Sequence, residues 1–149
     1  MLQKLIKNKT KVLWATFLIV LLVLIRVFES NLFYDPFLEY YKKEFTHLPL
    51  PTFNVFKLFF SLGMRFYINS VISLFLLYVL FQDTQIVKFS ALLYVVFGSV
   101  LMISFVFMLT FFGEDNKMAL FYIRRFIIQP IFIMLFIPAF YYQKKTSNK

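Results

Sequence analysis

Long apolar stretches alternate with short polar segments along the chain, and this pattern predicts four membrane-spanning helices. The predicted spans cover residues 11–28, 63–82, 88–112 and 122–142. A helix needs about 20 predominantly apolar residues to cross a bilayer, within a range of roughly 17 to 25. No internal repeat or linker divides the chain. We therefore expect one domain over residues 1–149, an all-α polytopic membrane protein built as a bundle of four transmembrane helices.

The segment between the first two predicted spans mixes charged with aromatic residues. Asp35-Pro36 is typical of a helix start, with Asp as the N-cap and Pro at the first helical position. We therefore expect a short amphipathic helix over residues 35–48 that lies at the membrane interface. Thr52 is the predicted cap of the helix that follows.

Small residues and prolines modify the later spans. Gly98, Ser99 and Ser104 predict a close approach of a neighbouring helix to the third span. Pro130 and Pro138 predict bends in the fourth, because each removes a backbone donor.

The composition favours lipid as the solvent and excludes several kinds of chemistry. Of the 149 residues, 61% are hydrophobic and 15% charged, whereas a soluble domain is about half apolar and about a quarter charged. The absence of Cys rules out disulfides and cysteine nucleophiles, and the single His47 cannot build a multi-histidine metal site. No catalytic or phosphate-binding motif is present. We therefore expect no catalytic residue, no metal and no cofactor.

The charges predict a topology. The net charge is +9, but the positive residues flank apolar segments, so nucleic acid is not an expected partner. The lysines before the first span resemble the start of a signal peptide, yet no cleavage site follows, so we expect an uncleaved span. Both tails carry lysine and no acid, which places both termini in the cytoplasm by the positive-inside rule. The outer face then receives every acid except Asp83, and all four arginines.

The arginines mark the predicted site, because three spans bring them to a similar depth near the outer boundary. Glu29 lies one helical turn from Arg26 and is the expected internal partner, while the loop acids have water to solvate them. Two interpretations stay open. Either the arginines anchor helix ends and pair with Glu29, Asp35 or a lipid phosphate, or they form a shared outer-face site for an anionic lipid or a partner helix. The residues of that candidate site are Arg26, Glu29, Arg65, Asn69, Arg124, Arg125 and Gln129.

Five short motifs occur in order along residues 11 to 143. They are RVFE at 26–29, LFYDP at 32–36, RFYINS at 65–70, FYIRRFIIQP at 121–130 and PAFYY at 138–142. Together they resemble the small membrane protein family called exosortase F system-associated proteins. The family occurs in flavobacteria and their relatives, encoded beside an exosortase-family protein. Exosortases are multi-spanning transpeptidases that process C-terminal sorting signals and use a Cys with Arg and His.

Because this chain has no Cys, the resemblance implies an accessory role and not the transpeptidase itself. The expectation is a non-enzymatic partner subunit of an exosortase-like protein-sorting system in the bacterial inner membrane, in contact with membrane lipid and with the transpeptidase. The alternative is a small membrane protein that binds an anionic lipid or a lipid-linked phosphate through its outer-face arginines.

Overall fold

The computed structural model describes residues 2–129 and 131–148, and within these ranges every regular element is a helix. The elements are α1 (Leu2–Lys7), α2 (Lys9–Val27), α3 (Glu29–Leu32), α4 (Phe37–Tyr40), the 3₁₀ turn η1 (Phe45–His47), α5 (Val55–Phe81), α6 (Thr84–Phe111), α7 (Lys117–Ile128) and α8 (Ile131–Ser147). Helices α2, α5 and α6 are each long and apolar enough to cross a membrane, and α7 with α8 makes a fourth span if the bent pair counts as one. The all-α fold is thus confirmed, with three to four candidate membrane-spanning helices.

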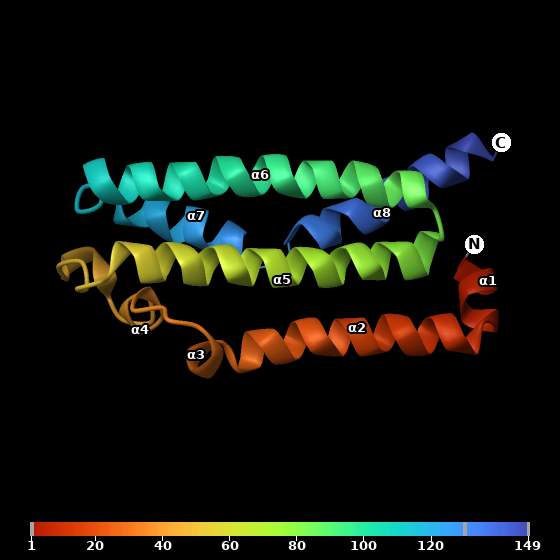
Figure 1. Cartoon of the computed structure of the whole chain (residues 1–149), viewed down its shortest axis with the longest axis horizontal. Helices are drawn as coiled ribbons and strands as arrows, with labels where there is room; N and C mark the ends of the chain where they lie inside the picture. Colours follow the sequence, from red (N-terminus) through yellow and green to blue (C-terminus); the bar gives the residue numbers. More distant parts are fainter. Residues whose placement is uncertain (1, 130, 149) are drawn as a thin grey trace.

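The long helices run side by side, with α5 between α2 and α6 (Figure 1). Helices α7 and α8 follow one another along the other side of α5 and α6 and contact both. Both ends of the chain lie at one end of the bundle, with the turn between α5 and α6 (Figure 1). We call this the terminal end. The opposite end, made of residues 28–54 and 112–116, is the loop end.

Two of the predicted helix starts are wrong. Helix α5 is capped by Asn54, whose side-chain oxygen accepts the backbone N–H groups of Phe56 and Lys57 at 3.1 and 3.3 Å, and not by Thr52. Asp35 caps no helix, because α4 follows Pro36 without a side-chain capping bond. Asp35 is instead drawn into ion pairs with two arginines.

The segment 35–48 also differs from the expected amphipathic helix. It contains the four-residue helix α4 and the 3₁₀ turn η1. Phe37 and Tyr40 point into the bundle, where both are buried. The Tyr40 hydroxyl lies 3.1 and 3.0 Å from the backbone carbonyl oxygens of Phe45 and Leu48, and its single hydrogen is shared between these two acceptors. This contact ties the two ends of the segment together. Aromatic packing and local hydrogen bonds therefore stabilise this segment, and it does not form a continuous helix.

The fourth predicted span is divided. Helix α7 ends at Ile128 and α8 begins at Ile131, and the two axes are bent by 59°. The expected bend at Pro130 lies outside the described residues. Pro138 lies inside α8, which continues through it to Ser147.

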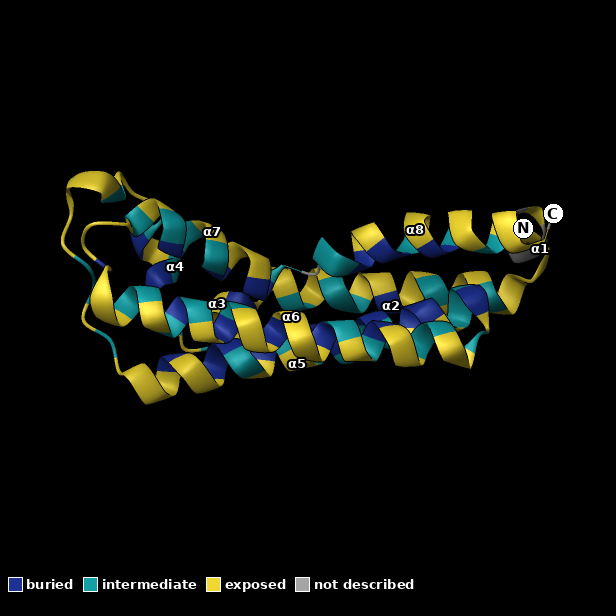
Figure 2. Ribbon diagram, turned by 90° about the horizontal axis from the view of Figure 1, so that it is seen from above, coloured by how far each residue is buried: buried dark blue, intermediate teal, exposed yellow. Residues whose placement is uncertain are grey.

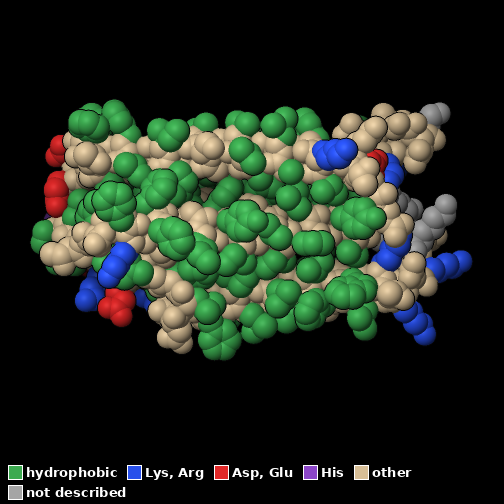
Figure 3. Space-filling model, in the orientation of Figure 1, with side chains coloured by type: hydrophobic (Ala, Val, Ile, Leu, Met, Phe, Trp, Pro, Cys, Tyr) green, Lys and Arg blue, Asp and Glu red, His purple; other side chains and the backbone are tan. Residues whose placement is uncertain are grey.

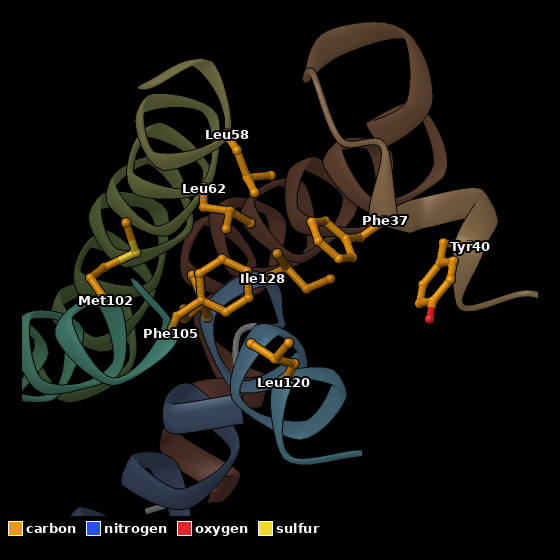
Figure 4. Packing of buried hydrophobic residues seen from close by; sticks show 9 residues of the cluster. Phe37, Tyr40, Leu58, Leu62, Met102, Phe105, Leu120 and Ile128 are labelled. Atoms are coloured by element: carbon orange, nitrogen blue, oxygen red, sulfur yellow. The ribbon is translucent and has the colours of Figure 1, made fainter. Parts of the chain in front are cut away.

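The interior consists of two apolar clusters, one toward each end of the bundle. The cluster at the loop end joins α4, α5, α6 and α7; Figure 4 shows Phe37 and Tyr40 beside the side chains of these helices. The cluster at the terminal end joins α2, α5, α6 and α8. Gly98 lets α5 and α6 approach closely, since a Cβ there would lie 2.4 Å from the Phe66 ring. The expectation of close helix packing at this small residue is confirmed.

The outer surface of the bundle is mostly apolar. Buried positions face inward, and exposed ones cover much of the long helices (Figure 2). In the view of Figure 3 hydrophobic side chains cover the middle of the molecule, while charged ones gather toward its two ends. In α2 the single buried residue among those described is Leu18. A surface of this kind suits contact with lipid and not with water.

Candidate functional site

Five charged residues meet beneath the loop end, and we call them the ion network: Arg26, Glu29, Asp35, Arg65 and Arg124. They come from different elements. Arg26 lies in the last turn of α2, Glu29 begins α3, and Asp35 lies in the loop before α4. Arg65 is ten residues into α5, which places it roughly 15 Å from the start of that helix at 1.5 Å per residue. Arg124 lies in α7.

Glu29 connects the end of α2 to α5. Its Oε2 accepts a hydrogen bond from Arg26 Nη1 at 2.7 Å and another from Arg65 Nη2. The pairing of Arg26 with Glu29, three residues apart, is the one the sequence predicts, and it is confirmed. Its extension to Arg65 makes Glu29 a link between two helices.

Asp35 connects α5 to α7. Its Oδ2 accepts from Arg65 Nη1 at 3.1 Å and from Arg124 Nη2, and its Oδ1 accepts from Arg124 Nε at 3.3 Å. The Asp35 side chain is 1% exposed. The prediction that loop acids are solvated by water is therefore wrong for Asp35. The arrangement places two arginines on one carboxylate, the kind of charge-assisted and forked contact that Arg forms best.

Burial makes the pairing necessary. The side chains of Arg65 and Arg124 are 1% and 5% exposed, whereas that of Arg26 is 47% exposed. An ion taken out of water loses several kcal/mol of hydration, and a partner charge with good hydrogen-bond geometry has to offset that loss. The two deepest guanidinium groups therefore each contact a carboxylate, while Arg26 keeps part of its hydration.

Aromatic rings complete the surroundings of the two buried arginines. The Arg65 guanidinium lies 5.3 Å from the Phe33 ring centroid, and that of Arg124 lies 5.7 Å from the Tyr41 ring centroid. Both distances fit cation–π contacts. Burial raises the pKa of the Tyr41 hydroxyl, against the opposing effect of the Arg124 charge, so Tyr41 stays neutral. The rings cover the ion network without adding a negative charge to it.

A second set of contacts ties the two loops of the loop end together. The backbone N–H of Leu50 donates to the Glu114 carboxylate at 3.1 Å, and Lys117 lies 3.4 Å from the same side chain. The Leu50 hydrogen bond lowers the pKa of Glu114, with a smaller contribution from Lys117. The segment that carries Asp35 and the loop before α7 are thereby held to one another.

Three of the predicted site residues lie outside the ion network. The Asn69 amide donates to the Ile128 carbonyl at 3.0 Å, which satisfies one of the free carbonyls at the end of α7. Arg125 donates through Nε to the side-chain oxygen of Gln129 at 3.2 Å, and Arg125 is exposed. The structure thus brings together four of the seven predicted residues and adds Asp35. The anchoring interpretation offers Asp35 as one partner of the arginines, and the structure confirms that pairing, although the predicted candidate site omits Asp35 because the adjoining proline favours a helix cap.

The charge of the ion network is unbalanced. Three guanidinium groups share two carboxylates, which leaves a formal charge of +1 when all five are ionised. Among residues 2–129 and 131–148, no group of three or more His, Cys, Asp or Glu side chains could hold a metal ion. The surplus positive charge lies beside Arg26, the one of the three arginines whose side chain is half-exposed.

Comparisons of the chain with protein-family models, with curated proteins and with solved structures give no match. The resemblance of residues 11 to 143 to exosortase F system-associated proteins therefore stays a prediction.

Proposed function

We propose that this protein is a non-enzymatic membrane subunit that assembles with a partner membrane protein. On the family resemblance, the partner is an exosortase-like sorting transpeptidase. The observation that carries the proposal is the ion network, which commits its two carboxylates to structural pairs and leaves Arg26 half-exposed with a surplus positive charge.

The paired state of the acids supports a non-enzymatic role. A general base or a nucleophile needs a lone pair that a substrate can reach. Asp35 is closed off by Arg65 and Arg124, and Glu29 accepts from two arginines while 9% exposed. These contacts suit a rigid docking surface more than a reaction centre.

The position of Arg26 supports contact with a partner. It lies in the last turn of α2, which is less covered by the described chain than the other two long helices, α5 and α6. An approaching helix can therefore reach both the apolar side of α2 and the guanidinium. An acidic side chain on that partner would balance the charge of the ion network. Arg presents two parallel donors to such a carboxylate, where Lys presents a point charge.

The proposal includes an orientation. The terminal end faces the cytoplasm of a bacterial inner membrane, and the loop end faces outward with the segment 35–48 at the membrane interface. The support is the charge distribution: lysine tails flank the terminal end, and every acid except Asp83 belongs to the loop end.

The test is made in cells that carry the exosortase-like enzyme and its sorting substrate. Deletion of the protein should let unprocessed substrate accumulate, and Arg26→Gln should do so in part and reduce co-purification with the enzyme. Because Arg26 is half-exposed and Glu29 keeps Arg65, the variant should remain at normal abundance. Arg26→Lys should recover some but not all of the co-purification.

Lys42→Gln is the matched control, since it removes one exposed positive charge from the loop end outside the ion network. It should leave co-purification and processing unchanged. Normal processing after full deletion would refute the accessory role, and normal co-purification of Arg26→Gln would remove Arg26 from the interface.

A second candidate function is the binding of an anionic lipid or a lipid-linked phosphate. The observation that favours it is the exposure of Arg125, whose contact is with the neutral Gln129 and not with an acid. The two candidates differ in what the purified protein carries, a companion protein or a phosphate-bearing lipid. Arg125→Gln should lower the lipid content under the second candidate and leave it unchanged under the first.

A further inference from the structure

We propose that the terminal end holds a binding cleft for an anionic phospholipid, formed by α1 and the first two turns of α2. This inference does not rest on the proposed function, because the residues that line the cleft belong to α1 and the start of α2. These elements lie at the end of the bundle opposite to α3 and α4 (Figure 1).

The cleft exists because the chain turns sharply between α1 and α2. Asn8 has φ −96° and ψ 89°, outside the helical region, and its carbonyl accepts the backbone N–H groups of Lys11 and Val12. Helix α1 is therefore turned away from the axis of α2 (Figure 1). The space between them is a cleft of about 760 Å³, lined mainly by Ile6, Lys9, Val12, Leu13, Trp14 and Phe17.

The apolar lining suits an acyl chain. Leu13, Trp14 and Phe17 are all more than half exposed, so the described chain leaves a large part of each side chain open to the surroundings. An indole is also favoured at the level of the lipid headgroups. The lining alone would accept any apolar group, so the kind of ligand depends on the charged residues beside the cleft.

The charges select an anionic headgroup. Lys9 lines the cleft, Lys7 is exposed next to it, and no acid occurs before Glu29. Each Lys near an anionic leaflet contributes about fivefold to its binding, through attraction that weakens with salt. A ligand that fits has an apolar tail and a negative head close together, which is the chemistry of an anionic phospholipid.

Trp14 makes the proposal measurable, because it is the single Trp of the chain and lies in the cleft. Brominated acyl chains quench the fluorescence of an indole that they contact. The full-length protein is reconstituted in phosphatidylcholine vesicles containing a minor fraction of brominated phosphatidylglycerol. In a parallel sample, the same fraction is brominated phosphatidylcholine. We expect the brominated phosphatidylglycerol to quench the Trp14 fluorescence more than its mole fraction in the vesicle would give for a random distribution of lipids. The brominated phosphatidylcholine should quench only to the extent that its mole fraction gives.

Lys9→Gln should lower the preference for phosphatidylglycerol about fivefold. Lys88→Gln is the matched control, because Lys88 is exposed near the same end, at the start of α6, and does not line the cleft. It should leave the preference unchanged. Equal quenching by the two brominated lipids would overturn the proposal. An equal loss of the preference for phosphatidylglycerol in Lys9→Gln and Lys88→Gln would also overturn it.

Discussion

The carboxylates of the ion network are more important to the fold than its most exposed arginine. Arg26 contacts one carboxylate and is half-exposed, whereas Glu29 is the shared acceptor of two guanidinium groups. An exposed ion pair is worth about 0 to 1 kcal/mol, but removing one partner of a buried pair costs about 3 to 5 kcal/mol because a charge is left without its counterion. The two members of one ion pair should therefore tolerate substitution very differently.

Thermal unfolding in detergent should show this asymmetry. Arg26→Gln should cost about 0 to 1 kcal/mol, and Glu29→Gln about 3 to 5 kcal/mol, because Arg65 loses one of its two carboxylates. Replacing both residues, as in Arg26→Met with Glu29→Leu, should not restore the loss, since Arg65 remains short of a partner. Similar small effects of all three changes would mean that Glu29 is solvated.

For single residues, the sequence predicts the contact within one helical turn, and it offers Asp35 as a partner of the arginines without indicating which arginines it contacts. Arg26 and Glu29 are three residues apart, so their pairing follows from helix geometry. Asp35 and Arg124 are 89 residues apart, and only the packing of the loop end brings them together. A long-range ion pair leaves no periodic signal in a single sequence.

Among the elements, the start of α5 offers a test of the corrected helix cap. Asn54→Ala should cost about 1 kcal/mol, because its side chain satisfies two free backbone donors of the first turn. Thr52→Ala, at the position the sequence favoured, should cost nothing measurable. Apparent Tm in detergent and hydrogen exchange at Phe56 and Lys57 would report both. A larger effect of Thr52→Ala would contradict the assignment.

The packing of α5 against α6 can be tested with two glycines. Gly98→Ala should destabilise the protein by about 1 to 3 kcal/mol, because the new methyl group would overlap the Phe66 ring. Gly63→Ala should be neutral or should stabilise by about 0.5 to 1 kcal/mol, since its nearest atom, in Met102, is 3.7 Å away and Ala favours helix. Equal thermal shifts for the two variants would place the close contact elsewhere.

Long apolar stretches made the number of spans and the bounds of α2 and α6 predictable, because lipid imposes a minimum length on a helix. The second span was predicted to begin at residue 63, but α5 begins at Val55, and the fourth span is divided. The segment 35–48 was harder, since its helical pattern was overridden by aromatic side chains that pack inward. The sequence predicted bends in one continuous fourth span, whereas α7 ends at Ile128. This end was not predictable because the Ile128 carbonyl accepts its hydrogen bond from Asn69, which belongs to another helix.

For the whole molecule, the distribution of charge between the two ends predicts the orientation in the membrane. A reporter fused after Lys149, or inserted at Asp83, should report the cytoplasm, because lysine tails resist translocation. A reporter at Glu39 or Asp115 should report the outside. The reverse pattern would place the ion network on the cytoplasmic side and exclude an exported sorting substrate as its neighbour.

In the whole molecule, one small group of charges joins three helices at the loop end, beside the apolar cluster. Glu29 links α2 to α5, and Asp35 links α5 to α7, so three helices and the loop between the first two meet at Arg65. The proposed docking surface at Arg26 has a fixed shape only if these links hold. The central claim is therefore that Asp35 is a buried ion-pair partner and not a solvated loop acid.

A double-mutant cycle on Asp35 and Arg124 tests that claim most directly. Thermal and denaturant unfolding in detergent would be measured for Asp35→Asn, Arg124→Met and the double variant. Arg125→Met and Gln129→Leu would form a control cycle on an exposed pair at the end of α7. We predict that the Asp35–Arg124 double variant is less destabilised than the sum of its single variants by about 1 to 3 kcal/mol, and that the control cycle is additive within about 0.5 kcal/mol. Additive effects in the Asp35–Arg124 cycle would show that the two residues do not interact and would contradict the ion network.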